Sequence, residues 1–424
     1  MAHESWGRWI RSTPRQVVDL SWTTDAPRFD DLVLPYAHGR SYGDVCLNNG
    51  HTLLDVSRMS RLLSFDETTG VLHCEAGATL ADILSVVVPR GWFLPVTPGT
   101  KFVSIGGCIA NDVHGKNHHR AGTFGRHVLS FELLRSDGSR VDCTPADDLF
   151  AATIGGLGLT GLIVSATVQL RRIESPEIVE ERIPFHSLAQ FEELSTASDE
   201  THEYTVAWLD TFTNRGLFIR GNHASQSHVP QARSHTRRAS RSVPVAPFAP
   251  FLTRPTVRAF NAAYFYGTRR ARAKRIDYDP FFYPLDAIAN WNAIYGRRGF
   301  LQYQFVIPER AGLAPVAEIL GRIGRISSPL TVVKKFGALP SPGLLSFPRA
   351  GTTVSMDFAA NAKGLLRLLD ECDATVASAG GSVYPAKDAR MAPEQFRRFF
   401  PRWEEFRRSV DPQFSSSFWR RVMQ

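Results

Sequence analysis

Three glycine-rich stretches in the N-terminal part of the chain have the composition of ligand-binding loops. They are residues 38–44 (HGRSYGD), 98–125 and 155–161 (GGLGLTG). The second holds six of the 32 glycines and three of the 13 histidines, and it lacks the periodicity of a long helix or strand. Glycine lets backbone amides approach a ligand closely. Three such loops predict one large phosphate-bearing ligand held by main chain, which we interpret as a flavin dinucleotide.

The histidines of the second stretch could also suggest a metal site. The string HGKNHH (114–119) packs three histidines and a lysine into six residues. No cysteine, aspartate or glutamate lies nearby at the spacing of a metal ligand. We therefore expect a polar loop that faces a cofactor, and no metal.

Two short motifs point to other enzyme classes, and their surroundings argue against both. Residues 39–43 (GRSYG) match the nucleophile elbow of serine hydrolases, but a turn and a strand follow where the elbow must open a helix. Residues 156–161 (GLGLTG) match the Rossmann fingerprint, which needs a strand before it and a helix after it. The pattern here predicts the reverse order. A hydrolase and a nicotinamide-binding Rossmann domain are therefore both disfavoured.

The segments around these loops read as short strands and helices in mixed order. Residues 79–88 and 147–153 have helical spacing, with Thr79 and Asp147 as N-caps. Alternating, β-branched segments predict strands at 32–37, 51–56, 70–76, 128–135, 140–143, 162–170, 206–210, 301–307, 330–334 and 352–358. Further helices are expected at 314–323, 363–378 and 393–410. This order indicates an α+β fold and not a doubly wound sheet.

The overall composition is that of an ordinary globular chain. Its 424 residues, 43% hydrophobic and 21% charged, are enough for two or three domains. Five widely spaced cysteines predict buried free thiols and not a disulfide framework. The first residues, MAHESWGRWIRSTPR, contain no apolar stretch. We expect no signal peptide, no transmembrane helix, and a location that is cytoplasmic or peripheral at the inner membrane.

The net charge of +8 is concentrated in one segment. Between Asp210 and Asp277 there are 13 positive charges and no acidic residue. Residues 221–256, rich in serine, histidine, arginine and proline, read as a mobile loop. Contact with an anionic membrane surface or a lipid phosphate is our functional interpretation. A solvated loop and a nucleic-acid patch are the alternatives.

Several strings together resemble a known family. HGRSYGD (38–44), PGT (98–100), SIGGCIANDVHGKNHH (104–119) and GGLGLTGLI (155–163) are similar to the PCMH-type FAD-binding domain of the vanillyl-alcohol-oxidase superfamily. The later strings resemble, in the same order, the decaprenylphosphoryl-β-D-ribose 2-oxidases, the flavoprotein half of a 2-epimerase. They are AWLD (207–210), FYPLD (282–286), WNAIYG (291–296), GFLQYQFVIP (299–308), KKFG (334–337) and YPAKDAR (384–390).

The resemblance implies a two-domain architecture. A FAD-binding domain would span residues 1–175, and the C-terminal segment 382–424 would return to it. Between them, residues 176–381 would form an antiparallel-sheet substrate domain with a basic mobile insert at 211–276. By position, the residues expected to contact FAD are His38, Gly39, Arg40, Ser41, Tyr42, Gly43, Asp44, Gly99, Thr100, Ser104, Ile105, Gly106, Gly107, Asn111, Asp112, Val113, His114, Ile163 and Tyr384.

The resemblance also implies the residues of an active site. His114, Lys116 and Lys387 are the expected catalytic residues, with His114 as a candidate proton acceptor and Lys387 as a positive charge for the reduced flavin. Water or Lys387 could serve as the base instead. The expected substrate residues are Trp208, Gln302, Gln304, Lys334, Ser355 and Lys387. Gln302, Gln304 and Lys334 could orient hydroxyls and phosphate.

Some positions depart from the family pattern. Many superfamily members tether the flavin through a histidine in the first loop, whereas Tyr42 stands there and cannot form that bond, so FAD should be non-covalent. Ser355 replaces the family's thiol, Phe282 its tyrosine and Ala293 its arginine. These three changes lie on the presumed substrate side, so the lipid or the sugar could differ.

The expected function is oxidation of the 2-hydroxyl of a polyprenyl-phosphoryl-β-D-ribose by FAD. A separate NAD(P)H-dependent short-chain reductase would complete the conversion to the arabinose donor of surface glycans. The expected partners are thus this reductase, the lipid-linked sugar phosphate and a membrane surface, without nucleic acid. An aldonolactone or free-sugar oxidase of the same superfamily is the alternative. A basic nucleic-acid-binding protein would explain the pI of about 9.4 but leaves the glycine loops unexplained.

Overall fold

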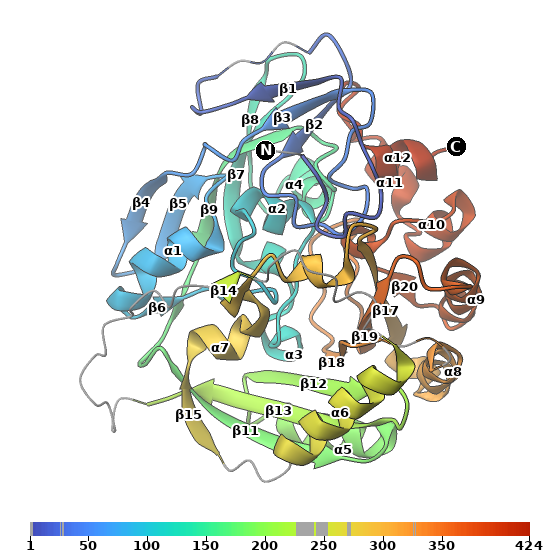
Figure 1. Cartoon of the computed structure of the whole chain (residues 1–424). Helices are drawn as coiled ribbons and strands as arrows, with labels where there is room; N and C mark the ends of the chain where they lie inside the picture. The colour runs from blue at the N-terminus through green and yellow to red at the C-terminus, as the bar shows by residue number, and fades with distance from the viewer. Residues whose placement is uncertain are drawn as a thin grey trace.

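A five-stranded antiparallel sheet forms the centre of the N-terminal half. The computed structural model describes residues 3–25, 27, 29–225, 241–242, 253–268, 273–324, 326 and 328–424. The order of the sheet is β4 (Leu62–Asp66), β5 (Val71–Glu75), β9 (Leu162–Gln169), β7 (Val128–Leu134) and β8 (Arg140–Cys143). Apolar residues of α1 (Leu80–Val87), α2 (Ile105–Ala110) and α4 (Asp148–Thr153) share its core. A parallel sheet of β1 (Gln16–Asp19), β3 (Thr52–Asp55) and β2 (Val33–Tyr36) lies above it in Figure 1.

The two predicted N-caps behave differently. Thr79 caps α1 as expected, because its side chain accepts from the amide of Asp82 and the Asp82 carboxylate accepts from the amide of Thr79. Asp147 precedes α4, but its carboxylate accepts hydrogen bonds from the amide and hydroxyl of Thr144 at 2.7 and 2.8 Å. Asp147 is therefore the N-cap residue by position, as predicted, but its side chain does not cap the helix, because the upstream turn takes the carboxylate.

An eight-stranded antiparallel sheet organises the second half. Its order is β15 (Lys274–Asp277), β11 (Glu177–Phe185), β13 (Arg215–His223), β12 (Tyr204–Asp210), β18 (Thr331–Phe336), β19 (Gly351–Ala359), β17 (Phe300–Pro308) and β20 (Ser382–Val383). Helices α5 (Leu188–Ser198), α8 (Ala314–Ile323) and α9 (Leu365–Ser378) contribute to the core on one face (Figure 1). The two antiparallel sheets with their helices confirm the predicted α+β fold.

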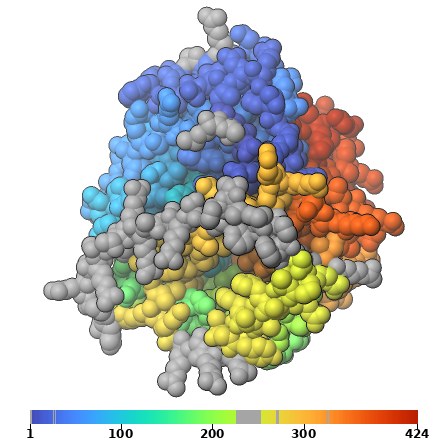
Figure 2. All heavy atoms as spheres, in the orientation of Figure 1, coloured from blue at the N-terminus to red at the C-terminus, as the bar shows by residue number. Residues whose placement is uncertain are grey.

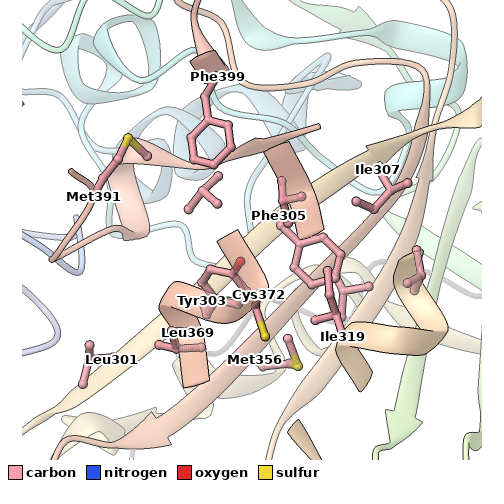
Figure 3. Close-up of a cluster of buried hydrophobic side chains, with 14 of the residues drawn as sticks. Leu301, Tyr303, Phe305, Ile307, Ile319, Met356, Leu369, Cys372, Met391 and Phe399 are labelled. Atoms are coloured by element: carbon pink, nitrogen blue, oxygen red, sulfur yellow. The ribbon is translucent and has the colours of Figure 1, made fainter. Parts of the chain in front are cut away.

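Strand β17 shows how the second sheet divides its two faces. Leu301, Tyr303, Phe305 and Ile307 point into the core with Ile319 of α8 and Leu369 of α9 (Figure 3). Successive side chains of a strand point to opposite faces, so Gln302 and Gln304 point the other way. That second face is the one on which the candidate site is built.

Two expectations about the C-terminal half need correction. The helix predicted over 393–410 is two helices, α10 (Pro393–Phe399) and α11 (Trp403–Arg407), because Pro401 cannot continue the first. Within the insert at 211–276, β13, β15 and helix α6 (Arg254–Thr268) are regular elements, so these parts are not a loop. Residues 226–240, 243–252 and 269–272 lie outside the described residues.

Part of the insert's positive charge is neutralised by neighbouring strands. Its residues pair with carboxylates on β11 and β12 as Arg215–Asp210, Arg220–Glu181, Lys274–Glu180 and Arg275–Glu177. In these four pairs, the positive side chains of the insert stabilise the contacts among strands β15, β11, β13 and β12. A role of the insert at a lipid surface would therefore depend on its other arginines.

The remaining short helices and strands lie outside the two large sheets. They are β6 (Trp92–Phe93), α3 (His118–Ala121), β10 (Arg171–Arg172), β14 (Arg241–Ser242), α7 (Tyr278–Phe282), β16 (Ile288–Ala289) and α12 (Ser417–Val422). All five cysteines are free thiols, and four of them are buried. Within the described ranges, no helix combines the length and the apolarity needed to cross a bilayer.

Candidate active site

One large cavity, of about 1130 Å³, lies between the glycine loops and the open face of the eight-stranded sheet. All predicted catalytic and substrate residues line it. Of the predicted cofactor residues, those that line it are His38, Gly39, Arg40, Ser41, Tyr42, Gly99, Thr100, Ser104, Gly106, Gly107, Asn111, Val113, His114, Ile163 and Tyr384. The structure therefore brings most of the predicted site together, although residues more than 300 positions apart contribute.

Four predicted cofactor residues do not line this cavity: Gly43, Asp44, Ile105 and Asp112. Gly43 packs so tightly that a Cβ atom there would lie 1.4 Å from the carbonyl oxygen of Asp388. Asp44 points to α12, where its carboxylate accepts from Arg421 at 2.7 and 3.0 Å. Ile105 is fully buried in the core of the first sheet. Gly43, Asp44 and Ile105 thus contact the protein on the side of the loops that faces away from the cavity.

Asp112 likewise turns its side chain away from the cavity. It adopts a left-handed backbone conformation, with φ 39°, and is fully buried. Its carboxylate accepts from the amide of Gly125 at 2.9 Å and from the hydroxyls of Ser341 and Ser346. Burial raises the pKa of this carboxyl group, and the hydroxyl donors oppose that rise. Asp112 therefore ties the segment before β19 to the second glycine loop.

The cavity has unpartnered polar atoms that fit a large polar cofactor. Within the described residues, Arg40 Nε, Asn111 Oδ1, Gln302 Oε1 and Gln304 Oε1 are buried without a hydrogen-bond partner. A bound ligand would satisfy them. The Arg40 guanidinium lies 4.2 Å from the Trp6 ring, which holds it in place. A Cβ atom on Gly99 would meet nothing within 4 Å, so this loop leaves room beside it.

The first backbone amides of helix α2 are not free to bind a ligand, although its small glycines leave room in the cavity. The amides of Ile105 and Gly106 donate to the carbonyls of Ala78 and Ala76, at 2.9 and 2.8 Å. The amide of Gly107 donates to the Ser104 hydroxyl at 3.2 Å. These three amides are thus already used inside the protein. The idea that this loop binds phosphate through them is not supported, and its glycines act by being small.

His114 lies at the junction of the glycine loop and the sheet. The Gln304 amide donates to His114 Nε2 at 3.0 Å and to the Thr353 hydroxyl at 3.1 Å. Lys334 Nζ lies 3.1 Å from His114 Nδ1. In this network His114 accepts at Nε2, so its proton is assigned to Nδ1, facing Lys334. Burial lowers the pKa of both groups well below their ordinary values, and their neighbouring lysines lower them further.

Two further lysines are buried in the same cavity. Burial lowers the pKa of Lys116 and of Lys387 to about 8 each. Lys387 lies over the Tyr42 ring, 5.1 Å from its centre. Lys116 donates to the carbonyl of Phe282 at 3.2 Å. The nearby carboxylate of Asp357 favours the charged form of Lys387, and burial raises the pKa of Asp357 itself to about 6.

The other two histidines of the glycine loop bind protein backbone. His118 Nδ1 accepts from the amide of Gly337 at 3.2 Å. His119 Nε2 lies 3.0 Å from the carbonyl of His202. Each ring of the HGKNHH string therefore meets a different element, so the string is a junction between the two sheets.

Sequence reasoning missed one end of the cavity. Val206, Ile219, Val257, Phe260, Tyr264, Phe281 and the charged pair Glu180 and Arg182 also line it. Their strands and α6 lie in or beside the basic segment, whose arginines and prolines concealed the regular pattern. The alternation of Val206 and Trp208 on one strand was the available signal. Among the departures from the family pattern, Ser355 and Phe282 line the cavity and Ala293 does not.

Comparison with known proteins agrees with this architecture. Residues 15–144 match the FAD binding domain family. Over 422 residues the chain is 36% identical to the decaprenylphosphoryl-beta-D-ribose oxidase of Mycolicibacterium smegmatis, covering 91% of this chain and 87% of that protein. It is 34% identical over 367 residues to an uncharacterized protein of Streptomyces coelicolor, covering 81% of this chain and 99% of that protein. Bovine mitochondrial D-2-hydroxyglutarate dehydrogenase is 27% identical over 38% of this chain and 33% of its own length.

Proposed function

The chain belongs to the decaprenylphosphoryl-beta-D-ribose oxidase family, and from that premise we propose that it oxidises a polyprenyl-phosphoryl-β-D-ribose. The 2-hydroxyl of the ribose becomes a 2-keto group, which is the first half of an epimerisation to the arabinose compound. FAD, the cofactor of the chain, supplies the acceptor for the hydride that leaves the sugar carbon. The observation that supports this proposal is a single cavity joining the glycine loops to glutamine and lysine side chains.

We propose that the glycine-loop side of the cavity holds FAD without a covalent bond. The fit rests on the unpartnered Arg40 and Asn111 and on the open space beside Gly99. Tyr42 occupies the loop position from which related enzymes tether the flavin. Acid precipitation of the purified protein should release the flavin into the supernatant. Flavin that stays in the pellet would contradict this assignment.

The proton of the sugar hydroxyl needs an acceptor. Two buried, mutually bonded bases with lowered pKa values can take up one proton between them. His114 is held at both ring nitrogens, by Gln304 and by Lys334. We therefore propose that the Lys334 and His114 pair accepts the proton of the sugar hydroxyl. Lys334 is the member of the pair that would contact the hydroxyl.

Charge balance in the cavity suggests roles for the other polar residues. Lys387 supplies positive charge beside Tyr42, on the cofactor side, where negative charge develops during reduction. Lys116 is a buried ammonium suited to the phosphate of the substrate. The unpartnered carbonyl oxygens of Gln302 and Gln304 can each accept from a sugar hydroxyl.

The direct test is anaerobic mixing of the holoenzyme with farnesylphosphoryl-β-D-ribose. The oxidised-flavin absorption should disappear within the time of one turnover, and the recovered sugar should have lost one hydrogen from carbon 2 and one from its hydroxyl. Free ribose and aldonolactones serve as the matched soluble compounds. If free ribose or an aldonolactone reduces the flavin as well as the lipid-linked sugar does, the result would favour the free-sugar oxidase alternative and contradict the proposal.

The proposed reaction implies further partners. The keto sugar must be reduced to reach the epimer, so we propose a separate NAD(P)H-dependent short-chain reductase.

A lipid-linked substrate favours peripheral contact with a membrane surface, supported by the basic segment between Asp210 and Asp277. Deleting residues 225–250 should weaken binding to anionic liposomes, and unchanged binding would contradict that role. We further propose the domain division at residues 175 and 382; the two sheets support the first boundary, whereas β20, after the second boundary, still pairs with β17 of the eight-stranded sheet.

A further inference from the structure

The cavity continues past the proposed sugar site, across the face of the second sheet. Directly opposed residues form one row from β17 to β13: Gln304, Ser355, Val332, Trp208 and Leu217. Strands in a sheet lie about 4.8 Å apart, so Trp208 stands about 14 Å from Gln304 along this row. All of these residues except Leu217 line the cavity. The row begins with polar side chains and becomes apolar after Ser355.

The apolar part of the cavity has both a floor and a roof. Val332 and Trp208, with Val206 and Ile219 in the neighbouring row, form the floor. Val257, Phe260 and Tyr264 of α6 and Phe281 of α7 line the other side. The ring of Tyr264 meets that of Trp208 edge-on at 4.9 Å, which joins roof to floor. We call this part the apolar arm.

Helix α6 divides its residues between two adjacent stripes. Val257, Asn261 and Phe265, spaced four apart, are buried, and Asn261 donates to the Asp210 carboxylate at 2.9 Å. The neighbouring stripe, Phe260 and Tyr264, faces the cavity. Phe260 nevertheless remains 59% exposed, and α6 lies on the visible face of the molecule, as yellow atoms in Figure 2. An aromatic side chain that lines a cavity and is also exposed marks an opening of that cavity.

Charged residues limit the direction of the arm. Glu180 and Arg182 line its far side on β11, where Arg182 Nε lies 2.6 Å from the Glu180 carboxylate. Glu180 is 2% exposed. A hydrocarbon chain gains nothing by contact with a buried ion pair, so its favourable route turns along α6 toward Phe260.

We propose that the apolar arm binds the first part of the prenyl chain of the substrate, which leaves the protein beside Phe260. This inference rests on the proposed function and adds the site for the lipid. A phosphate ester of an isoprenoid is anionic at one end and apolar beyond it. The cavity offers both kinds of contact, because the buried Lys116 ammonium lies beside Phe281, and the other aromatic and branched side chains of the arm follow from there.

The test compares two ligands that share the phosphate and differ in chain length. Dissociation constants of farnesyl phosphate and dimethylallyl phosphate are measured on the holoenzyme by calorimetry. Phe260→Ser and Tyr264→Ser each remove an aromatic ring that the bound chain would cover, so each should weaken farnesyl phosphate binding about tenfold. Dimethylallyl phosphate, too short to reach α6, should bind the variants as it binds the wild type.

Tyr266→Ser is the matched control. Tyr266 lies on the same helix and is 53% exposed, but it does not line the cavity. It should leave both dissociation constants unchanged. Equal weakening of both ligands by Phe260→Ser, or no weakening of either, would overturn the inference. Phe260 is largely exposed, so this variant should fold even if Tyr264→Ser does not.

Oxidation of farnesylphosphoryl-ribose separates this inference from the proposed function. If the wild type binds farnesyl phosphate through Phe260 but oxidises no prenyl-phosphoryl sugar, the prenyl site is supported and the proposed function is contradicted. If it oxidises the sugar while Phe260→Ser leaves the preference for long chains intact, the function stands and the arm fails.

Discussion

Lys387 gives the reaction a pH limit that can be measured. The residue acts as a cation, and burial lowers its pKa to about 8. Because only the protonated form carries charge, the rate of flavin reduction should be level just below that pH and fall as the pH rises through about 8. Lys387→Arg should move this fall to higher pH, since a guanidinium stays charged. Lys116→Arg should leave the fall in kcat where it is, and a shift there instead would contradict the assignment.

Adjacent lysines on β18 allow a matched test of the proton acceptor. Lys334 faces His114, whereas Lys335 points to the other side and pairs with Glu309 at 3.3 Å. Loss of a general base costs about 10²–10⁴ in rate, so Lys334→Met should reduce kcat by that order. Lys335→Met should stay within a factor of about two, as expected for a surface ion pair. Equal effects of the two changes would rule out a special role for Lys334.

Ser355 predicts resistance to one kind of inhibitor. It lines the cavity opposite Gln304 on the neighbouring strand, where the family has a thiol. A hydroxyl is a much weaker nucleophile than a thiolate. An inhibitor that captures the family's thiol should therefore leave the wild type unmodified and add its mass to Ser355→Cys. An adduct on wild-type Ser355 in the mass spectrum would contradict this prediction.

Which single residues could be predicted depended on what surrounds them. Gln302 and Gln304 were predictable, because alternation along a strand assigns them one face. The orientation of Asp112 was not, because its partners Ser341 and Ser346 lie more than 220 positions away. No pattern in the sequence around Asp112 predicts a contact with residues so far along the chain.

At the scale of elements, Asp112 holds the second glycine loop against the segment before β19. Asp112→Ala removes the acceptor of three buried donors and places alanine at a positive φ of 39°. We expect a loss of about 3 kcal/mol in unfolding free energy, seen as a lower Tm. Asp112→Asn, which keeps one acceptor and tolerates this conformation, should lose less. An unchanged Tm for Asp112→Ala would show that the contacts contribute nothing.

Regular elements were predictable where one physical signal dominated. The strand over residues 162–170 and helix α1 with its Thr79 cap follow directly from side-chain alternation and capping. Helix α6 was missed, because Arg254, Pro255 and Arg258 continue the arginine- and proline-rich composition of the preceding residues. Its apolar stripe has meaning only against the sheet on which it packs.

At the scale of the whole molecule, the C-terminal helix stabilises the first glycine loop. Arg421 of α12 pairs with Asp44 at 2.7 Å and with Asp388 at 3.0 Å, and both carboxylates are buried. Arg421→Met would leave two buried acids without their cation, at a cost of about 3–5 kcal/mol in unfolding free energy. Flavin should also dissociate more readily. The exposed pair of Arg402 and Glu405 provides the control, since Arg402→Met should cost less than about 1 kcal/mol.

Strand β17 also constrains how this protein can change over time. Its odd residues fill the core and its even residues face the reaction, so inserting or deleting one amino acid would exchange the two sets. Glutamines would then enter the core, and phenylalanine and tyrosine would enter the site. Substitutions can therefore accumulate at single positions of this strand, while a change in its length removes stability and activity in the same event.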